Sequence, residues 1–153
     1  AGVGHKAGGR GKALKAAGLK GSIVSGDGSK DEQLIKQAGA ASDGIYLSCP
    51  CGGPPAAGGV GADKFAADYK AKYNTAEGTY SAEAYDAANL LVEAIVKAGS
   101  DDPTKIRDAM ANIKDFKAVT GPLSFDKDGN PIKSAVVLQI KDGKQKYVET
   151  VNP

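Results

Sequence analysis

The sequence has 153 residues, of which 41% are hydrophobic and 25% are charged, and it contains no tryptophan. Such a composition is typical of a soluble globular chain that is long enough to bury one ordinary core. The 20 basic and 18 acidic side chains are mixed along the chain, and no basic face with interleaved aromatic residues stands out, so we expect no nucleic-acid partner. No apolar run approaches the roughly 20 residues that a membrane-spanning helix needs.

The first two fifths of the chain are rich in glycine, with 16 of the 21 glycines lying in residues 1–61. Ala, Lys and Leu favour a helix that ends at Gly18, but the three glycines at positions 8, 9 and 11 each cost about 1 kcal/mol relative to alanine. We therefore predict a weak helix there, followed by a short buried strand over "GSIVS" at 21–25.

The next helix carries clearer end signals. Ser29 at the N-cap and Glu32 three residues later match a capping box, and Gly39 marks the helix C-terminus. A second strand is predicted over "GIYLS" at 44–48. The segment "CPCGGPPAAGGVG" at 49–61 then reads as a Gly/Pro-rich connector, because neither a helix nor a sheet accommodates that many breakers.

Residues 63–113 have a helical period. Asp63 is predicted to cap one helix, and Asp102-Pro103 is predicted to begin another, with a long helix at 81–98 between them that Gly99 ends. The apolar positions along the first helix are Phe65, Tyr69 and Tyr73, those along one face of the long helix are Ala84, Ala88, Leu91 and Ile95, and those facing inward from the last are Ile106, Met110 and Ile113.

The last third changes to a strand period. "GPLSF", "AVVLQI" and "QKYV" read as strands, and Asp142-Gly143 is a hairpin turn between the last two. Strands that alternate with helices, with strands again at the C-terminal end, indicate an α/β class.

The stretch "SGDGS" at 25–29 is the first candidate site. Asp27 lies between Gly26 and Gly28, where a strand leads into a helix, and ligands of open α/β sheets bind at such strand ends. A helix N-terminus alone favours an anion, but the Asp27 carboxylate favours a cation such as an ammonium. The alternative is that Asp27 only caps the helix or the turn.

Three other patterns are weaker candidates for a functional site. Gly2-x-Gly4-x-x-Ala7 has the outline of a dinucleotide fingerprint, which needs a strand directly before it and a well-formed helix after it, and Gly8, Gly9 and Gly11 disfavour that helix. Cys49-Pro50-Cys51 lacks the four ligands of a structural zinc site and the spacing of a thioredoxin-type motif; structural cysteines, or partners for another thiol, fit better. "DKDGN" at 126–130 begins like a calcium loop but lacks its later ligands, so it is predicted to be a turn.

Three segments together resemble a known family: "GLKGSIVSGDGSKDEQLIKQAGAASDGIYLSCPC", "FAADYKAKYNTAEGTYSAEAYDAANLLVEAIVKAGS" and "VTGPLSFDKDGNP". They are similar to the type I solute-binding proteins of branched-chain amino acid ABC transporters, the leucine/isoleucine/valine-binding group, from about Lys12 to the C-terminus. The resemblance implies a type I periplasmic-binding-protein fold, in which two lobes, each a parallel sheet sandwiched by helices, close on an amino acid.

Family members are about twice this length, so the resemblance implies that the chain is their C-terminal half only. Residues 1–48 would belong to the second lobe, 49–62 to a hinge or connector, and 63–119 to the closing helices of the first lobe. Residues 120–153 would form the cross-over, near Gly121–Pro122, and the terminal strands of the second lobe. Exposed sheet edges would then need the missing N-terminal half or self-association.

The family's ligand residues carry over to two positions. Its glycine-flanked acid, which binds the ligand's α-ammonium, falls on Asp27 with Gly26 and Gly28, and an aromatic ligand contact falls on Tyr80. The stretch around Val3, where the family often has an aromatic residue, departs from the pattern. The resemblance implies a bacterial binding protein without enzyme activity, cofactor or metal, periplasmic or anchored at the cell surface, that hands an amino acid to an ABC transporter permease.

Two alternatives remain from the sequence. A dinucleotide-binding enzyme domain would use the glycines at 2 and 4. A non-binding fragment of a larger protein would have only a structural or interaction role.

Overall fold

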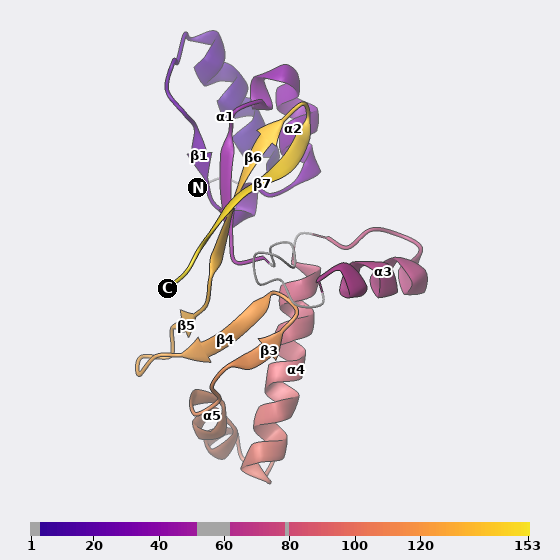
Figure 1. The fold of residues 1–153 in the computed structure, drawn as a ribbon, viewed down its shortest axis with the longest axis vertical. Coiled ribbons are helices and arrows are strands. Elements are labelled where there is room, and N and C mark those ends of the chain that lie inside the picture. The colour runs from indigo at the N-terminus through magenta and orange to yellow at the C-terminus, as the bar shows by residue number, and fades with distance from the viewer. Residues whose placement is uncertain (1–3, 52–61, 79) are drawn as a thin grey trace. The chain divides into compact units, whose positions relative to one another are not determined.

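The computed structural model describes residues 4–51, 62–78 and 80–153, and it divides into two compact units (Figure 1). The first unit comprises Ala1–Pro50 and Ala135–Val151, and the second comprises Cys51–Ser134 with Asn152–Pro153. The chain thus returns to the first unit at Ala135. The strand that begins at Gly121 pairs within the second unit.

The first unit packs helices on a four-stranded mixed sheet with the order β1-β2-β6-β7. Its strands β1 and β2 are parallel, while β2–β6 and β6–β7 are antiparallel, so the sheet is mixed rather than parallel. The elements of this unit are α1 (Gly4–Ala16), β1 (Val24–Ser25), η1 (Asp27–Ser29), α2 (Glu32–Ala38), η2 (Gly39–Ser42), β2 (Tyr46–Cys49), β6 (Ala135–Lys141) and β7 (Lys144–Val151). Its core is formed by Leu34, Ile45, Leu47 and Ile140.

The glycine-rich segment forms the predicted helix α1, which packs against α2. Gly8 and Gly11 are buried. A Cβ on Gly8 would lie 2.8 Å from the backbone oxygen of Leu34, and one on Gly11 would lie 3.1 Å from Cδ1 of Ile45. These two glycines therefore allow a close approach of α1 to its neighbours, a packing role that offsets their low helix propensity.

Both helix ends predicted by glycines are confirmed. Gly39, with a φ of +56°, directly follows the last residue of α2, and Gly18, with a φ of +85°, lies two residues after the last residue of α1. At the end of α1 the amide of Gly18 donates to the carbonyl of Lys15, and the amide of Leu19 donates to that of Leu14. This pair of bonds is a Schellman motif, which satisfies carbonyls that the last helical turn leaves open.

The predicted capping box of α2 is wrong. The N-cap is Asp31, whose side chain accepts a hydrogen bond from the amide of Gln33. Ser29 belongs to η1 instead, where it is 1% exposed and its hydroxyl lies 2.7 Å from that of Ser25. The strand–helix junction is thus one 3₁₀ turn longer than the sequence suggests.

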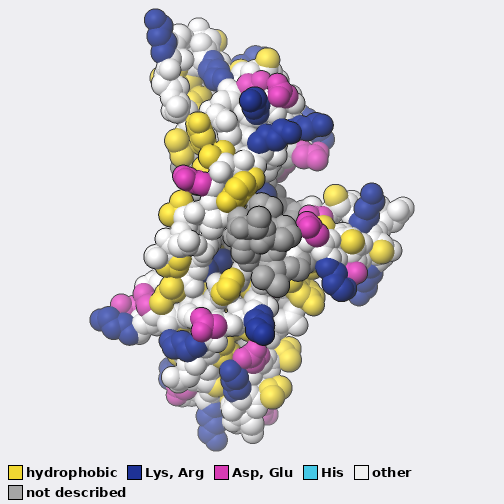
Figure 2. Space-filling view, in the orientation of Figure 1, with side chains coloured by type: hydrophobic (Ala, Val, Ile, Leu, Met, Phe, Trp, Pro, Cys, Tyr) yellow, Lys and Arg dark blue, Asp and Glu magenta, His cyan; other side chains and the backbone are white. Residues whose placement is uncertain are grey.

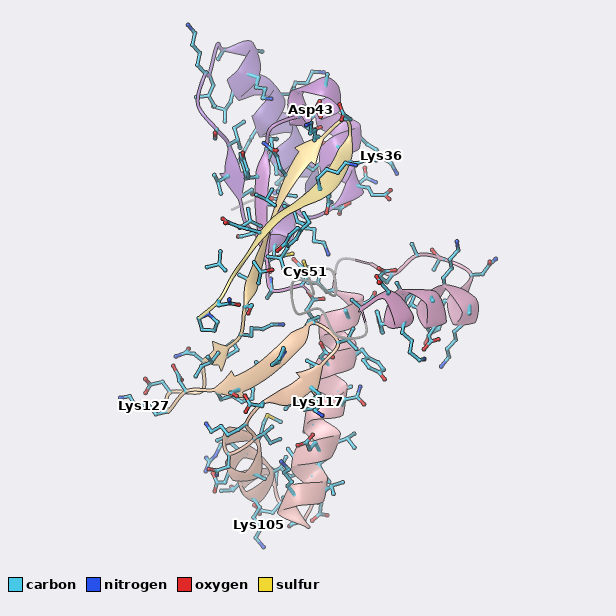
Figure 3. All side chains as sticks on the ribbon, in the orientation of Figure 1. Lys36, Asp43, Cys51, Lys105, Lys117 and Lys127 are labelled. Carbon is cyan, nitrogen blue, oxygen red and sulfur yellow. The ribbon has the colours of Figure 1, made fainter. Side chains whose placement is uncertain are left out.

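The hairpin of β6 and β7 forms as predicted, with Asp142 and Gly143 at positive φ, as a two-residue turn of this kind requires. The hairpin end is tied to the loop before β2, since the amide of Gly143 donates to Oδ1 of Asp43 at 3.3 Å. Lys15 of α1 donates to the backbone carbonyl of Asp43, the residue that is labelled in this unit in Figure 3. This loop is therefore fixed on both sides.

In its described residues, the second unit combines three helices with a three-stranded antiparallel sheet of order β3-β4-β5. Its core consists of Leu90, Ala94, Ile113, Phe116 and Ala118, with Ile106 and Met110 packed against it as predicted. The elements are α3 (Ala62–Tyr73), α4 (Ser81–Ala98), α5 (Pro103–Ala111), β3 (Phe116–Ala118), β4 (Gly121–Phe125) and β5 (Pro131–Ile132).

Helix α4 has the predicted bounds and the predicted left-handed Gly99 at its end, but the predicted apolar face is exposed. The buried residues of α4 are Asp86, Leu90 and Ala94, whereas the exposed residues include Ala84, Ala88, Leu91 and Ile95. Asp86 replaces an apolar residue on the buried face because it is satisfied by hydrogen bonds, described below.

Helix α3 begins one residue before Asp63, so Asp63 lies in the first turn and is not the cap. The predicted stripe does form, since ring centroids are 5.8 Å apart for Phe65 and Tyr69 and 4.7 Å apart for Tyr69 and Tyr73. None of the described residues of α3 is buried, so the stripe is only partly covered.

Helix α5 begins as predicted, with Asp102 accepting a hydrogen bond from the amide of Lys105 and proline at the first position. The turn at 126–130 also forms: Oδ1 of Asp126 accepts from the amides of Asp128 and Asn130, and its Oδ2 accepts from the Asn130 side chain. Both cysteines are disulfide-bonded, so neither is a reactive thiol.

Candidate functional site

Asp27 lies at the carboxyl end of β1, in the first position of η1. Strand β1 pairs in parallel with β2, so this is the edge of the sheet where ligands of α/β folds bind. The turn is held by its own hydrogen bonds, in which the amide of Ser29 donates to the carbonyl of Gly26 and the amide of Lys30 donates to that of Asp27. The Asp27 side chain therefore projects from a fixed backbone.

The Asp27 carboxylate is exposed, and one of its oxygens is hydrogen-bonded to the described part of the chain. Its Oδ1 accepts a hydrogen bond of 2.8 Å from the amide of Gly28, and its Oδ2 accepts none from the residues that the structure describes. Asp27 does not cap α2, because Asp31 does. Asp27 is therefore not the N-cap of α2, but its Oδ1 does cap the turn by accepting a hydrogen bond from Gly28. Its Oδ2 can accept a hydrogen bond from a bound donor.

The two flanking glycines leave room at this turn. Gly26 has φ −83° and ψ −175°, an extended conformation open to any residue, and a Cβ built on it would meet nothing within 4 Å. Neither Gly26 nor Gly28 has a positive φ. The turn therefore does not need these glycines for a left-handed backbone conformation. The open space beside Gly26 leaves the turn accessible to a ligand.

Tyr80 directly precedes α4 and is 51% exposed. Its carbonyl accepts the amide of Ala84 at 3.0 Å, and the neighbouring Ser81 bonds to Gly78 through both its amide and its hydroxyl oxygen. The backbone of Tyr80 is thus part of the first turn of α4, while its ring is available for a contact outside the unit's core.

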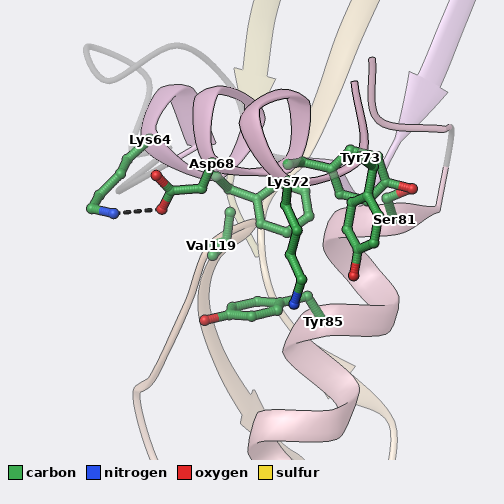
Figure 4. A pocket seen from close by; sticks show the side chains of 9 residues that line it. Lys64, Asp68, Lys72, Tyr73, Ser81, Tyr85 and Val119 are labelled. Atoms are coloured by element: carbon green, nitrogen blue, oxygen red, sulfur yellow. Dashed lines mark hydrogen bonds and ion pairs between the residues drawn. The ribbon is translucent and has the colours of Figure 1, made fainter. Parts of the chain in front are cut away.

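A cavity of about 540 Å³ lies within the second unit between α3 and α4 (Figure 4). The Phe65 and Tyr85 rings meet there, with centroids 5.3 Å apart, and Lys72 lies 5.5 Å from the Tyr73 ring centroid. The exposed Lys64 donates to Asp68, and this hydrogen bond raises the pKa of the Lys64 ammonium. The cavity is lined by Ser81 and not by Tyr80.

Charged side chains of both signs are distributed over the surface. Basic and acidic side chains are interspersed on the face shown in Figure 2. Among the residues that the structure describes, no group of His, Cys, Asp and Glu is arranged to hold a metal ion. No helix in those same residues has the length and apolarity needed to cross a membrane.

Sequence reasoning missed a buried polar group around Thr120. Asp86 is 6% exposed and Thr120 is also 6% exposed, and the hydroxyl of Thr120 lies 2.7 Å from Oδ2 of Asp86 and 2.6 Å from Nζ of Lys133. Burial lowers the pKa of Lys133, while the carboxylates of Asp86 and Glu83 act in the opposite direction. The signal that could have found it is a charged residue spaced by four from Leu90 along α4.

The chain is similar to known solute-binding proteins in sequence. The family model described as "Periplasmic binding protein" matches residues 3–145. Leu/Ile/Val-binding protein homolog 1 of Brucella abortus is 32% identical over 136 residues, which cover 86% of this chain and 36% of the relative. The leucine-, isoleucine-, valine-, threonine- and alanine-binding protein of Pseudomonas aeruginosa is 31% identical over 117 residues, covering 76% of this chain and 30% of the relative.

Solved structures agree. A leucine-binding protein LivK from Thermotoga maritima is 32% identical with a TM-score of 0.87. The branched-chain amino acid transporter substrate-binding protein LivJ from Streptococcus pneumoniae, in complex with isoleucine, is 33% identical with a TM-score of 0.83. Each match covers 99% of this chain and 43% of the other. The chain therefore spans about two fifths of the length of these proteins.

Proposed function

Because this chain belongs to the periplasmic binding protein family, we propose that it is part of a binding protein that captures an amino acid and delivers it to an ABC transporter permease. The resemblance seen in the sequence and the type I fold class are confirmed. The matched relatives are solute-binding proteins, a non-enzyme family, which overturns the dinucleotide-enzyme alternative. Gly2, the first glycine of that dinucleotide fingerprint, lies outside the described residues.

The observation that carries the proposal is that, among the described residues, only one of the two oxygens of the Asp27 carboxylate accepts a hydrogen bond. Its Oδ1 accepts from Gly28, which orients the group, and its Oδ2 is available at the end of β1. An α-ammonium fits this acceptor, since hydrogen bonds to charged groups are worth about 1.5–3 kcal/mol. We propose that Asp27 binds the amine of the ligand, with Gly26 and Gly28 leaving it room.

Tyr80 is the second proposed contact. Its exposed ring has apolar faces and a polar hydroxyl, and its backbone is fixed at the start of α4. We propose that the ring packs on the ligand rather than in the core. The relatives named above include proteins described as binding leucine, isoleucine or valine, so we propose a branched-chain or related amino acid as ligand.

Thermal unfolding and calorimetry of the intact protein that contains this chain test the proposal. L-Isoleucine, L-leucine and L-valine are each added, and binding at a hundred times the Kd stabilises the folded state by about 2.7 kcal/mol. Asp27→Asn should weaken binding roughly 10- to 150-fold. The matched control is Asp31→Asn, which removes the same charge four residues away and keeps a good N-cap. No stabilisation by any amino acid, or equal losses in the two variants, would contradict the proposal.

We infer the location and the delivery partner from the family. Its members are periplasmic binding proteins, so we propose a periplasmic or surface-anchored protein in bacteria that presents its ligand to a membrane permease. We further propose that the first unit corresponds to the second lobe of the family and that α3 and α4 correspond to first-lobe helices. Transport assays with a permease mutant check the delivery step.

We also propose that a complementary polypeptide, or a second copy, covers α3 and α4. Both helices expose apolar side chains: α3 buries none of its described residues, and α4 exposes Leu91, Val92, Ile95 and Val96. Sedimentation of the isolated 153-residue chain should show self-association or poor cooperativity of unfolding. A stable monomer that binds no amino acid would instead support the non-binding fragment.

A further inference from the structure

The buried carboxylate of Asp86 fixes the turn between β3 and β4 to α4. Its Oδ1 accepts from the amide of Val119 at 2.7 Å, and its Oδ2 accepts from the amide and the hydroxyl of Thr120 at 3.0 Å and 2.7 Å. The turn thus satisfies the carboxylate with three donors. A buried carboxylate bonded in this way is expensive to disturb.

Lys133 extends this arrangement to the segment that follows β5. Its Nζ donates to the Thr120 hydroxyl at 2.6 Å. An ammonium can only donate and an ionised carboxylate can only accept, so the Thr120 hydroxyl accepts from Lys133 and donates to Asp86. One hydroxyl therefore joins two charged groups, and we call Asp86, Thr120 and Lys133 the Thr120 network. The chain enters the first unit two residues after Lys133.

The Thr120 network contacts the N-terminal half of α4. In residues 81–89, the N-terminal half of the helix, Asp86 is the one buried residue, whereas the apolar Leu90 and Ala94 are buried in the C-terminal half. The C-terminal half is therefore held by the apolar core, and the N-terminal half is held by hydrogen bonds of Asp86. A helix of 18 residues is long enough, at about 27 Å, for a small tilt to move its first turn appreciably.

Tyr80 is attached to this N-terminal half. Its carbonyl accepts the amide of Ala84, so its backbone follows the first turn of α4. A second carboxylate lies in the same turn: Oε2 of Glu83 is buried and has no hydrogen-bond partner among the residues that the structure describes. Glu83 also favours the charged form of Lys133. The ammonium of Lys133 thus compensates two carboxylates on one end of α4.

We propose that the Thr120 network is a positioning device for ligand binding, which sets the orientation of the first turns of α4 and through it that of the Tyr80 ring. This inference rests on the proposed function, in which Tyr80 contacts the amino acid. The network residues act through Tyr80 and do not touch the ligand themselves.

Calorimetry with L-isoleucine on the intact protein tests the inference, at a temperature where unfolding curves show every variant folded. Thr120→Val keeps the shape and removes the hydroxyl, and it should weaken binding roughly five- to tenfold. Thr120→Ser keeps the hydroxyl and should bind within about twofold of the parent. In a Tyr80→Ala background the Thr120→Val change should have no further effect, because the ring that it positions is gone.

Lys133→Met serves if Thr120→Val does not fold, because it removes the outer hydrogen bond and leaves the bonds of Asp86 to the turn. It should weaken binding roughly two- to threefold, again only when Tyr80 is present. Full affinity in Thr120→Val, or an equal loss with and without the Tyr80 ring, would overturn the inference.

A readout without ligand separates failure of this inference from failure of the proposed function. If the parent protein binds no amino acid, the proposed function fails, and backbone ¹⁵N relaxation then tests the network on its own. Thr120→Val should increase the mobility of the amides of Tyr80 and Ser81, and Thr120→Ser should not. Unchanged relaxation at both amides would overturn the positioning role irrespective of ligand.

Discussion

Gly8 of α1 lies directly against the backbone of Leu34 in α2. A Cβ built on Gly8 would be 2.8 Å from the carbonyl oxygen of Leu34 and 3.1 Å from Cβ of Gln37. Gly9, the next residue, faces open space, and a Cβ there would meet nothing within 4 Å. Two adjacent glycines of one helix thus have opposite roles, since one permits the helix contact and the other only lowers helix propensity.

Alanine at these two positions should therefore have opposite effects on the free energy of unfolding. Gly8→Ala forces α1 away from α2 and should destabilise the protein by about 1–3 kcal/mol. Gly9→Ala should stabilise it by roughly 0.5–1 kcal/mol through helix propensity. Denaturant unfolding of both variants measures this. Equal changes in the two variants would show that α1 does not make this contact.

Asp31, and not Ser29, should control the start of α2. Asp31→Ala removes the acceptor for the amide of Gln33 and should cost about 1 kcal/mol, while Asp31→Asn should cost little, because asparagine is an equally good N-cap. Hydrogen exchange at the Gln33 amide should quicken in Asp31→Ala only. If Ser29→Ala alone quickens it, the capping box predicted from the sequence is the correct description.

The turn at 126–130 should make stability depend on acid pH. The side chain and amide of Asn130 donate to Asp126 and hold the pKa of its carboxyl below the usual value. The folded-state pKa therefore lies under the unfolded-state pKa, so this contribution is complete above the unfolded value and is lost as the pH falls through the folded one. Asp126→Asn should remove that part of the pH dependence.

Unfolding measured between about pH 2 and pH 6, a range that spans the carboxyl titration, checks this expectation. Asp128→Asn is the control, because the side chain of Asp128 lies 4.0 Å from Lys127 on the surface and its amide, not its carboxylate, bonds to Asp126. A parent protein whose pH profile is the same as that of Asp126→Asn would contradict the role of the turn.

Local signals in the sequence predicted where most elements lie but not which faces are buried. The bounds of α4 follow from Gly99 and from the helical period, and the hairpin follows from Asp142-Gly143. The apolar face of α4 was misplaced because Asp86 is buried through amides of a turn that is more than 30 residues away in sequence. Only the tertiary structure shows that these donors reach it.

Tertiary structure also limits what the sequence indicates about the candidate site. Asp27 can be proposed from its place between a strand and a helix, and its binding role stays a prediction; its Oδ2 accepts no hydrogen bond from the described residues. Spacing along α4 can mark Asp86 alone, and it cannot identify the whole Thr120 network, because the three members come from α4, from the β3–β4 turn and from the segment after β5. Strands such as β3 and β5 are also too short for an alternating hydrophobic pattern to be recognised in the sequence.

The central claim, that Asp27 binds an amine, is tested most directly by changing the amine itself. Calorimetry of the intact protein compares L-isoleucine with its α-hydroxy analogue, which lacks the ammonium, in the parent and in Asp27→Asn. The parent should prefer the amino acid roughly 10- to 150-fold, and Asp27→Asn should lose that preference while unfolding at a similar temperature. An undiminished preference in Asp27→Asn would contradict the claim.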